Sequence, residues 1–265
     1  MKLQKLISKL EKHHKKKLDL SLGRTFNLLK KLGDPQDKLK NVITVVGTNA
    51  KASMCYSLKS ILNQGGYKTN LYTSPHLLSY TERYVFEDKE INEEDLIELL
   101  TDVEKTLGDD NATLFEILTC AFLKYAENFK DNINIIEAGL FHQFDSTNVF
   151  KENLMTLIGV IHNDHFQWLE NKSIEGVIYE KTAKLLNSNI FINKQVNNEI
   201  RDKIDKSLEK NTSNKYFFGK DFNIAKSENG FIQYQDGLGE LVLPEPSILG
   251  DHQLYNISTS IAASR

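Results

Sequence analysis

A lysine stands at the junction of a buried strand and a helix in VITVVGTNAKASMCYSLKSIL, residues 42–62. The apolar and β-branched residues 42–46 predict the strand, and the residues from 51 onward carry a helical pattern. Between them, Gly47, Thr48, Asn49 and Ala50 form a small-residue turn that ends at Lys51. This is the order of a phosphate-binding loop, because the free N–H groups of the helix and the ammonium both attract phosphate oxygens.

Two alanines occupy positions at which phosphate-binding loops usually carry glycine. Glycine supplies positive φ and close backbone approach, whereas alanine in a left-handed conformation costs roughly 1–2 kcal/mol. Ala50 and Ala52 therefore impose a penalty without prohibiting phosphate binding. On spacing alone, an ordinary strand-to-helix connection with an exposed lysine remains an alternative.

Polar side chains also follow two other predicted strands. The loop TSPHLLSYTER, residues 73–83, offers Ser74 to a cation or phosphate, and His76 and Arg83 to an anionic or heteroaromatic ligand, while Pro75 stiffens the turn. Glu137 ends the apolar run INIIEAG, at the place where a carboxylate beside a phosphate would hold Mg²⁺. Taken singly, the loop has the alternative of a polar connection with a structural histidine, and the carboxylate that of merely reaching solvent.

Two later segments carry further candidates. LFHQFDSTN, residues 140–148, supplies Asp145 in a polar cluster that would cap a helix or hold a substrate. IHNDHFQW follows a strand and brings His165, and Lys181 lies inside the next helix. Spacing by itself assigns no function to either of these last two residues.

Alternating strands and helices are expected to position these loops. The predicted strands are 42–46, 68–74, 133–139, 154–161 and 189–193, and the predicted helices are 22–32, 51–64, 92–107, 113–129, 173–186 and 197–210. This alternation predicts an α/β fold: a mostly parallel sheet with helices on both faces and ligands at the carboxyl ends of the strands. Short β segments over 214–243 predict a small antiparallel annex, and a last helix starts near Asp251. We expect residues 1–265 to form one domain.

Composition excludes several classes of partner. The formal net charge of −3 gives no field that would attract nucleic acid or an anionic membrane, and the basic run at 9–20 is read as a solvated helix face. No apolar run approaches the length of a membrane span. Two cysteines, Cys55 and Cys120, lie in apolar helical patterns and predict no disulfide. A cytoplasmic location is expected.

In order and spacing, these stretches together resemble the folylpolyglutamate synthase and dihydrofolate synthase family of the Mur ligase superfamily. The similar stretches are LGRTFNLLKKLGDPQ (22–36), GTNAKAS, YTSPHL, ER, FEILTCAF, EAGL…DSTNV, NDH, YEKTA and GDHQLYN (250–256). The resemblance implies a P-loop NTPase-like central domain. It also implies an ATP-dependent ligase of folate biosynthesis, which phosphorylates a pteroate or folate carboxylate and lets the amine of L-glutamate attack the acyl phosphate.

The resemblance also assigns roles to residues around the phosphates. Lys51 would neutralise the ATP phosphates as a catalytic residue. Ser74 and Glu137 would hold a first Mg²⁺. His165 and Lys181 would hold a second Mg²⁺, and these two residues would also be catalytic. Lys181 matches a lysine that is carbamylated in the family, which would turn a cation into an oxygen ligand. The phosphate loop would be completed by the remaining ATP-binding positions, Gly47, Thr48, Asn49 and Ser53.

Substrate contacts are implied in the same way. The pteridine and its benzoate would lie against Pro75, His76 and the segment around Asp145, with Arg83 nearby, and Asn256 would contact the adenine. Family members carry a second, Rossmann-like C-terminal domain that supplies the glutamate site, and this chain is expected to lack it. Steady glutamate ligation would require that domain in cis.

Departures from the family pattern leave two alternatives. The usual loop GTNGKGS reads GTNAKAS here, and GLGGRLDATN reads GLFHQFDSTN. One alternative is a related Mur-type amide ligase acting on another carboxylate, which the altered LFHQ segment favours. The other is a non-catalytic nucleotide-binding or interaction module. The joint presence of Lys51, Ser74, Glu137, His165 and Lys181 argues against the second, since drift has no reason to retain five site positions.

Overall fold

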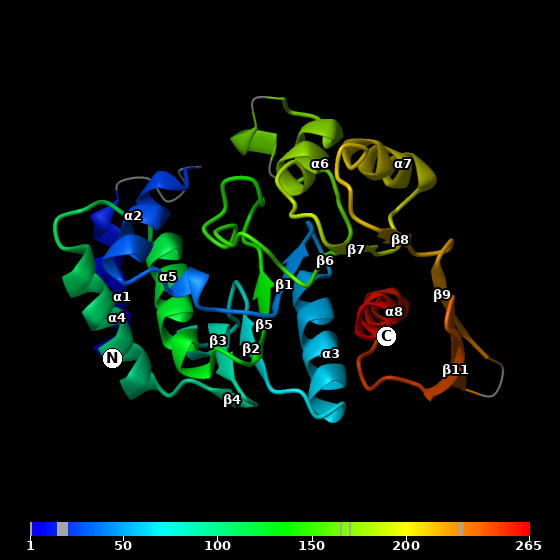
Figure 1. Cartoon of the computed structure of the whole chain (residues 1–265), viewed down its shortest axis with the longest axis horizontal. Helices are drawn as coiled ribbons and strands as arrows, with labels where there is room; N and C mark the ends of the chain where they lie inside the picture. The colour runs from blue at the N-terminus through cyan, green and yellow to red at the C-terminus, as the bar shows by residue number, and fades with distance from the viewer. Residues whose placement is uncertain (1, 15–20, 165, 170, 228–229) are drawn as a thin grey trace.

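An eight-stranded sheet organises the chain in a computed structural model, which describes residues 2–14, 21–164, 166–169, 171–227 and 230–265 (Figure 1). The strand order is β4-β3-β2-β5-β1-β6-β7-β8. The strands are β1 (Val42–Val46), β2 (Thr69–Tyr72), β3 (Tyr84–Phe86), β4 (Lys89–Glu90), β5 (Ile133–Glu137), β6 (Met155–Ile158), β7 (Asn189–Ile192) and β8 (Lys215–Phe217). Six strands run parallel and β3 and β4 add an antiparallel edge, which confirms the predicted mostly parallel sheet.

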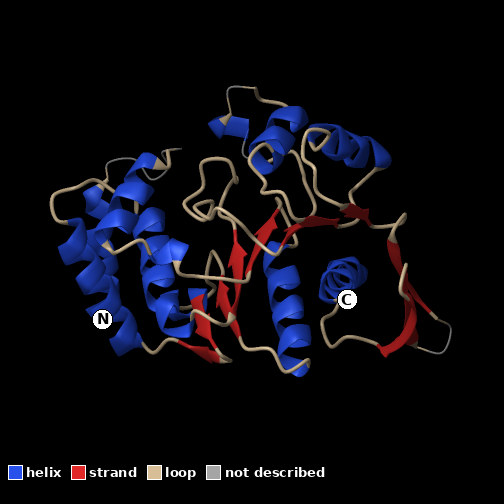
Figure 2. Ribbon diagram, viewed as in Figure 1, coloured by secondary structure: helices blue, strands red, loops and turns tan. Residues whose placement is uncertain are grey.

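Helices cover both faces of this sheet (Figure 2). They are α1 (Lys2–Leu10), α2 (Gly23–Lys31), α3 (Lys51–Gln64), α4 (Glu93–Leu107), α5 (Leu114–Ala126), α6 (Ile174–Thr182), α7 (Asn198–Ser207) and α8 (Asp251–Ser264). Side chains alternate along β1, so Ile43 and Val45 pack towards α3, whereas Val42 and Val46 face the other layer. Burial on both faces explains why β1 is apolar throughout.

Most predicted elements are confirmed, several to the residue. Asn92 caps α4, with its side-chain oxygen accepting from the N–H of Asp95, and Ser173 caps α6 through the N–H of Gly176. The expected end of α6 near residue 186 is wrong. The helix stops at Thr182, and a turn closed by Leu185 N–H on the Thr182 carbonyl carries Leu185 into the core.

The antiparallel annex exists but begins later than predicted. It consists of β9 (Phe222–Lys226), β10 (Phe231–Asp236) and β11 (Gly239–Pro244), and packs on α8. The first β segment of the 214–243 stretch instead joins the main sheet as β8, parallel to β7. Stacking of Phe191 on Tyr216, with ring centroids 4.9 Å apart, favours this pairing.

Three smaller expectations concern the rest of the chain. Cys55 and Cys120 are buried and free, as predicted. The basic run at 9–20 is described only as far as His14, so residues 15–20 of that prediction lie outside the described residues. Across the described ranges, no helix has both the length and the apolar character to cross a membrane.

Candidate nucleotide-binding site

The loop after β1 is fixed to the end of β6 by its backbone. The N–H groups of Thr48 and Asn49 both donate to the carbonyl of Val160, at 2.9 and 3.0 Å. The hydroxyl of Thr48 in turn accepts from the N–H of His162 at 3.2 Å. The segment that follows β6 therefore fixes the position of this loop. The loop lies at the carboxyl edge of the sheet, where ligands bind in this class of fold.

Ala50 takes the backbone conformation that a glycine would take. Its φ is 73°, in the left-handed region, and it stands immediately before the first residue of α3. Lys51 opens the helix, and its ammonium donates to the carbonyl of Thr48 at 3.2 Å, so the side chain curls over the loop. With alanine at position 50, the loop therefore still adopts the backbone conformation expected of a phosphate-binding loop.

A glycine not singled out from the sequence makes this loop possible. A Cβ on Gly159, in the segment after β6, would lie 2.4 Å from the carbonyl oxygen of Asn49. A Cβ on Gly47 would lie 3.0 Å from the Cα of Gly159. The two backbones touch because neither residue has a side chain. The signal in the sequence was a single glycine directly after the strand LMTLI.

Glu137 meets Lys51 and Ser74 at the end of β5. One carboxylate oxygen lies 4.0 Å from the Lys51 ammonium, and the other accepts from the N–H of Ser74 at 3.0 Å. The side chain is only 3% exposed, and burial raises the pKa of this carboxyl to about 7 against the opposing effects of Lys51 and the Ser74 N–H. A buried carboxylate with incomplete compensation fits a metal cation.

A cavity of about 390 Å³ opens over these groups. Seven of the residues predicted from the sequence line it: Thr48, Asn49, Lys51, Ser74, Pro75, His76 and Glu137. Ala50 and Ala52 of the loop also line it, together with Tyr56, Thr73, Leu77 and Glu82, which were not predicted as site residues. The structure therefore brings the phosphate loop and the TSPH loop to one side of the same buried carboxylate.

Arg83 lies behind His76. The Arg83 guanidinium donates to Nδ1 of His76 at 2.9 Å, and both side chains pack on the ring of Tyr80. Partial burial, reinforced by the charge of Arg83, lowers the pKa of His76 below its usual value. The neutral imidazole thus presents its other nitrogen to a ligand, while Arg83 orients the ring.

Lys181 lies beneath the phosphate loop. Its ammonium donates to the carbonyls of Gly47, at 2.9 Å, and Leu140, at 2.7 Å, and it lies 5.5 Å from the ring centroid of Phe141. The residue is 1% exposed. Burial, with the charge of Lys51 adding to it, lowers the pKa of Lys181 to about 7 against the opposing carboxylates of Asp145 and Asp164.

Asp145 is engaged within its own loop. It accepts from the N–H of Gly139 and from both the N–H and the hydroxyl of Thr147, at 2.6–3.1 Å. Burial raises the pKa of this carboxyl. It does not line the cavity above Glu137, so its predicted contact with the substrate remains a prediction.

Three of the predicted ATP contacts, Gly47, Ser53 and Asn256, also lie outside that cavity. Ser53 lies in the first turn of α3 and is half-buried. Asn256 is buried in α8, with its amide accepting from Asn193 at 2.8 Å and donating to Gln253 at 3.0 Å. His165 lies outside the described residues. Within the described part of the chain, no three His, Cys, Asp or Glu side chains gather into a metal-binding group.

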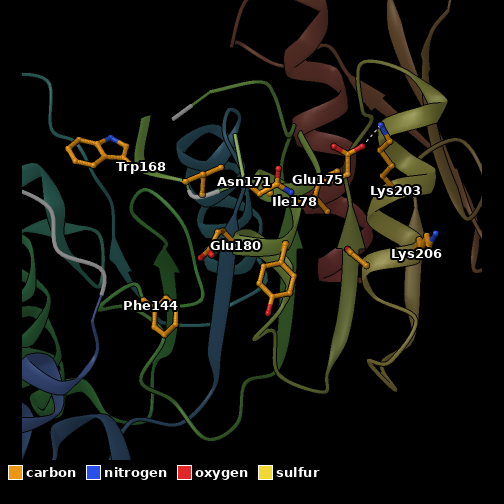
Figure 3. Close-up of a pocket in the computed structure, with 12 residues that line it drawn as sticks. Phe144, Trp168, Asn171, Glu175, Ile178, Glu180, Lys203 and Lys206 are labelled. Atoms are coloured by element: carbon orange, nitrogen blue, oxygen red, sulfur yellow. Dashed lines mark ion pairs between the residues drawn. The ribbon is translucent and has the colours of Figure 1, made fainter. Parts of the chain in front are cut away.

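A wider groove of about 1000 Å³ lies along α6 and α7. Figure 3 shows Phe144 and Trp168 on one side of it, and Lys203, paired with Glu175 at 2.7 Å, on the other. None of the described residues predicted for the site lines it. Phosphate chemistry needs the helix start and the lysine, and these are found at the smaller cavity.

The parallel sheet, the loop entering α3 and the adjoining carboxylate define a nucleotide-binding domain of the Mur ligase type. Known proteins of similar sequence and structure support this classification. The sequence is 35% identical over 163 residues to the dihydrofolate synthase/folylpolyglutamate synthase of Escherichia coli, covering 62% of this chain and 38% of that protein. No protein-family model matches the sequence.

Solved structures extend the similarity along the whole chain. One is E. coli FolC in complex with DHPP and ADP (TM-score 0.86, 27% identity, 99% of this chain and 62% of that one). Another is a bifunctional folylpolyglutamate synthase/dihydrofolate synthase of Yersinia pestis with AMPPNP and Mn ion (TM-score 0.85, 27% identity, 98% and 61%). The chain is similar along its length to dihydrofolate synthase/folylpolyglutamate synthases, and it spans less than two thirds of the length of these relatives.

Proposed function

We propose that this chain is the ATP-binding part of a ligase that joins L-glutamate to dihydropteroate or folate through an acyl phosphate. The observation that carries the proposal is the meeting of Lys51, Glu137 and Ser74 at the start of α3. Similar proteins that hold ADP or AMPPNP support it. The remaining domain of such a ligase, in cis, would supply the glutamate site.

The residues around Glu137 fit a divalent cation. The carboxylate is buried, its pKa is raised to about 7, and the Lys51 ammonium at 4.0 Å compensates its charge only in part. Glu137 and the hydroxyl of Ser74 would hold Mg²⁺ beside the phosphates, and His165 a second ion. When bound, the metal neutralises negative charge that develops on the transferred phosphoryl group.

The protein side chains contribute positioning and charge. The Lys51 ammonium donates a long hydrogen bond of 3.2 Å to the Thr48 carbonyl and lies 4.0 Å from Glu137, so little holds it from turning towards a phosphate. The first N–H groups of α3 have no partner within the helix and point to the same place. Pro75 and His76 line the same cavity, where the carboxylate substrate would lie.

Carbamylation of Lys181 is part of the proposal. A pKa of about 7 leaves a large share of the amine neutral at neutral pH, and only the neutral amine adds to CO₂. The new N–C bond forms with loss of one proton, and the carbamate nitrogen keeps a single N–H. One of the two contacts, to Gly47 or to Leu140, would then be released. A carbamate resonance in NMR spectra with ¹³C-bicarbonate, absent in Lys181→Met, tests this step.

The altered LFHQ segment does not reach the cavity. Phe141 and His142 are 1% and 3% exposed, and the ring of Phe141 lies beside the Lys181 ammonium. They therefore give no support to a different carboxylate substrate, and the left-handed Ala50 supports a retained phosphate loop over a decayed one.

Calorimetric titration of the chain with a non-hydrolysable ATP analogue, with and without Mg²⁺, tests the proposal. Losing a hydrogen bond to a charged group costs about 1.5–3 kcal/mol, so Lys51→Ala should weaken Mg²⁺-dependent binding by about tenfold or more. The matched control is Lys59→Ala on the same helix, where the lysine pairs with Asp88. Equal binding by Lys51→Ala and the unaltered chain would refute the proposal.

A further inference from the structure

A carboxylate that the proposed function does not use lines the cavity beside the phosphate loop. Glu82 belongs to the short helix η3 (Tyr80–Arg83) and lies in the wall of this cavity of about 390 Å³, together with His76 and Leu77. The phosphates and the carboxylate substrate would lie in the same cavity. A negative charge without a partner would repel both of them. The contacts of Glu82 show where its charge is directed instead.

Three successive backbone N–H groups compensate that charge. The N–H of Leu77 donates to one carboxylate oxygen of Glu82 at 2.8 Å, and those of Leu78 and Ser79 donate to the other at 2.7 and 2.6 Å. Hydrogen bonds to an ionised carboxylate are among the stronger ones in proteins. The bonds from Leu77 and Ser79 contribute most to lowering the pKa of Glu82, so this side chain stays ionised at neutral pH. The backbone of residues 77–79 is therefore folded around it.

The neighbouring residue, Arg83, holds the earlier part of the same loop. Its guanidinium donates to Nδ1 of His76 at 2.9 Å, and its carbonyl accepts from the N–H of Thr73 at 3.3 Å. The ring of Tyr80 packs against both side chains, with its centroid 4.2 Å from that of the His76 ring and 5.2 Å from the guanidinium carbon. Glu82 and Arg83 thus fix consecutive parts of the loop, with His76 at the junction between them.

Apolar packing does not fix the tip of this loop. The side chains of Leu77 and Leu78 are 92% and 94% exposed, so they contribute almost no buried contact. A segment with few buried apolar contacts opens locally at low cost in free energy unless polar bonds hold it. The tip therefore keeps its shape through the bonds to Glu82, and these bonds leave the exposed side chain of Leu77 in the wall of the cavity.

We propose that Glu82 is a positioning residue, which holds the backbone of residues 77–79 so that His76 and Leu77 form the wall against which the carboxylate substrate lies. The identity of that substrate rests on the proposed function. The phosphate loop is anchored separately, on the carbonyl of Val160. Loss of the Glu82 carboxylate should therefore disturb the wall that faces the substrate and leave the phosphate side of the cavity intact.

Calorimetric titrations with Mg²⁺ separate the two sides of the cavity with two probes: a non-hydrolysable ATP analogue, and dihydropteroate added after that analogue. Glu82→Gln should weaken dihydropteroate by about tenfold or more, because a displacement of about 1 Å in a positioned site costs up to about 100-fold, and should leave the analogue unchanged. Glu82→Asp, which keeps the charge, should lose less. The matched control is Glu90→Gln, since Glu90 accepts from the Thr81 hydroxyl at 3.3 Å and should affect neither probe.

The tautomer of His76 gives a second measurement that needs no ligand. Because Nδ1 accepts from Arg83, the neutral ring carries its proton on Nε2, which ¹H–¹⁵N NMR spectra of the imidazole report. Glu82→Gln should give a mixture of both tautomers, whereas Glu90→Gln should keep one. A general loss of stability would not change the tautomer of a folded chain.

Thermal melts establish that each variant is folded at the temperature of measurement, and Glu82→Asp replaces Glu82→Gln if the latter is not. An unchanged affinity for dihydropteroate, an equal loss for both probes, or an unaltered tautomer in Glu82→Gln overturns the inference. If the unaltered chain binds neither probe, the proposed function fails, and the tautomer of His76 alone decides whether Glu82 positions the loop.

Discussion

The left-handed backbone of Ala50 makes a testable contribution to stability. At φ 73° its Cβ crowds the following carbonyl, at a cost of about 1–2 kcal/mol that glycine does not carry. Ala50→Gly removes this cost but makes the unfolded chain more flexible, which opposes the gain by about 0.4–1 kcal/mol. The expected net result is a rise in the free energy of unfolding of about 0.5–1 kcal/mol.

Ala52→Gly is the control for the same chemical change in ordinary helical backbone. Ala52 is exposed in the first turn of α3 and has no positive φ, so glycine there should lower the free energy of unfolding by about 0.5–1 kcal/mol. The two substitutions, two residues apart, should therefore differ by about 1–2 kcal/mol and in opposite directions.

Urea unfolding of both variants, followed by circular dichroism, measures this difference from the transition midpoints at constant slope. A second measurement is affinity for the ATP analogue, which Ala50→Gly should preserve because the loop keeps its conformation. Equal destabilisation by the two substitutions would show that Ala50 is not held in the left-handed region, and the phosphate-loop geometry would be refuted with it.

Three further outcomes follow from the site. Gly159→Ala places a Cβ 2.4 Å from a carbonyl and should lower the free energy of unfolding by about 1–3 kcal/mol in urea melts, whereas Gly237→Ala, with open space around it, should stay within about 0.5 kcal/mol. Burial raises the pKa of Glu137 to about 7 in the folded state against 4.5 unfolded, so the contribution of this carboxyl to stability should fall by about 3 kcal/mol across that interval as pH rises. His142, whose pKa burial lowers to about 4, contributes in the opposite sense, so the measured quantity is the difference in the free energy of unfolding between Glu137→Gln and the unaltered chain, which should shift by about 3 kcal/mol between urea melts at pH 4.5 and 7.5. Arg83→Met should raise the pKa of His76 in an NMR titration, because the positive charge beside the ring is lost; an unmoved pKa would contradict the contact.

Local sequence was sufficient for the elements that carry the phosphate loop. β1 and α3 have the predicted bounds. The five-residue apolar run determines the strand, and the helical pattern followed by Gly65-Gly66 determines the helix and its end. The same holds for α4, whose Asn92 cap and acidic first turn mark its start. The order of these elements then places Ser74, Glu137 and Lys51 at one edge of the sheet.

Contacts distant in sequence decided what local patterns did not. The pairing of β8 with β7 depends on Phe191 meeting Tyr216, 25 residues later, and a short β segment does not reveal its partner. The direction of Lys181 depends on carbonyls of Gly47 and Leu140, each supplied by another loop. The hydrogen bonds of Asp145 to Gly139 and Thr147 likewise could not be read from the sequence, and its predicted contact with a substrate remains a prediction.

The structure also shows which glycines such a loop needs. Where backbones touch, as Gly47 and Gly159 do, any Cβ must displace main chain, and no rotation relieves the overlap. At Ala50 the demand is only for a positive φ, which alanine meets at a cost of about 1–2 kcal/mol. At Ala52 the backbone is helical and makes no demand at all. The glycine pattern of the sequence motif treats these positions alike, whereas the geometry shows that the cost of a side chain differs among them. Within the loop GTNAKAS, alanine replaces glycine only at positions 50 and 52, where that cost is small.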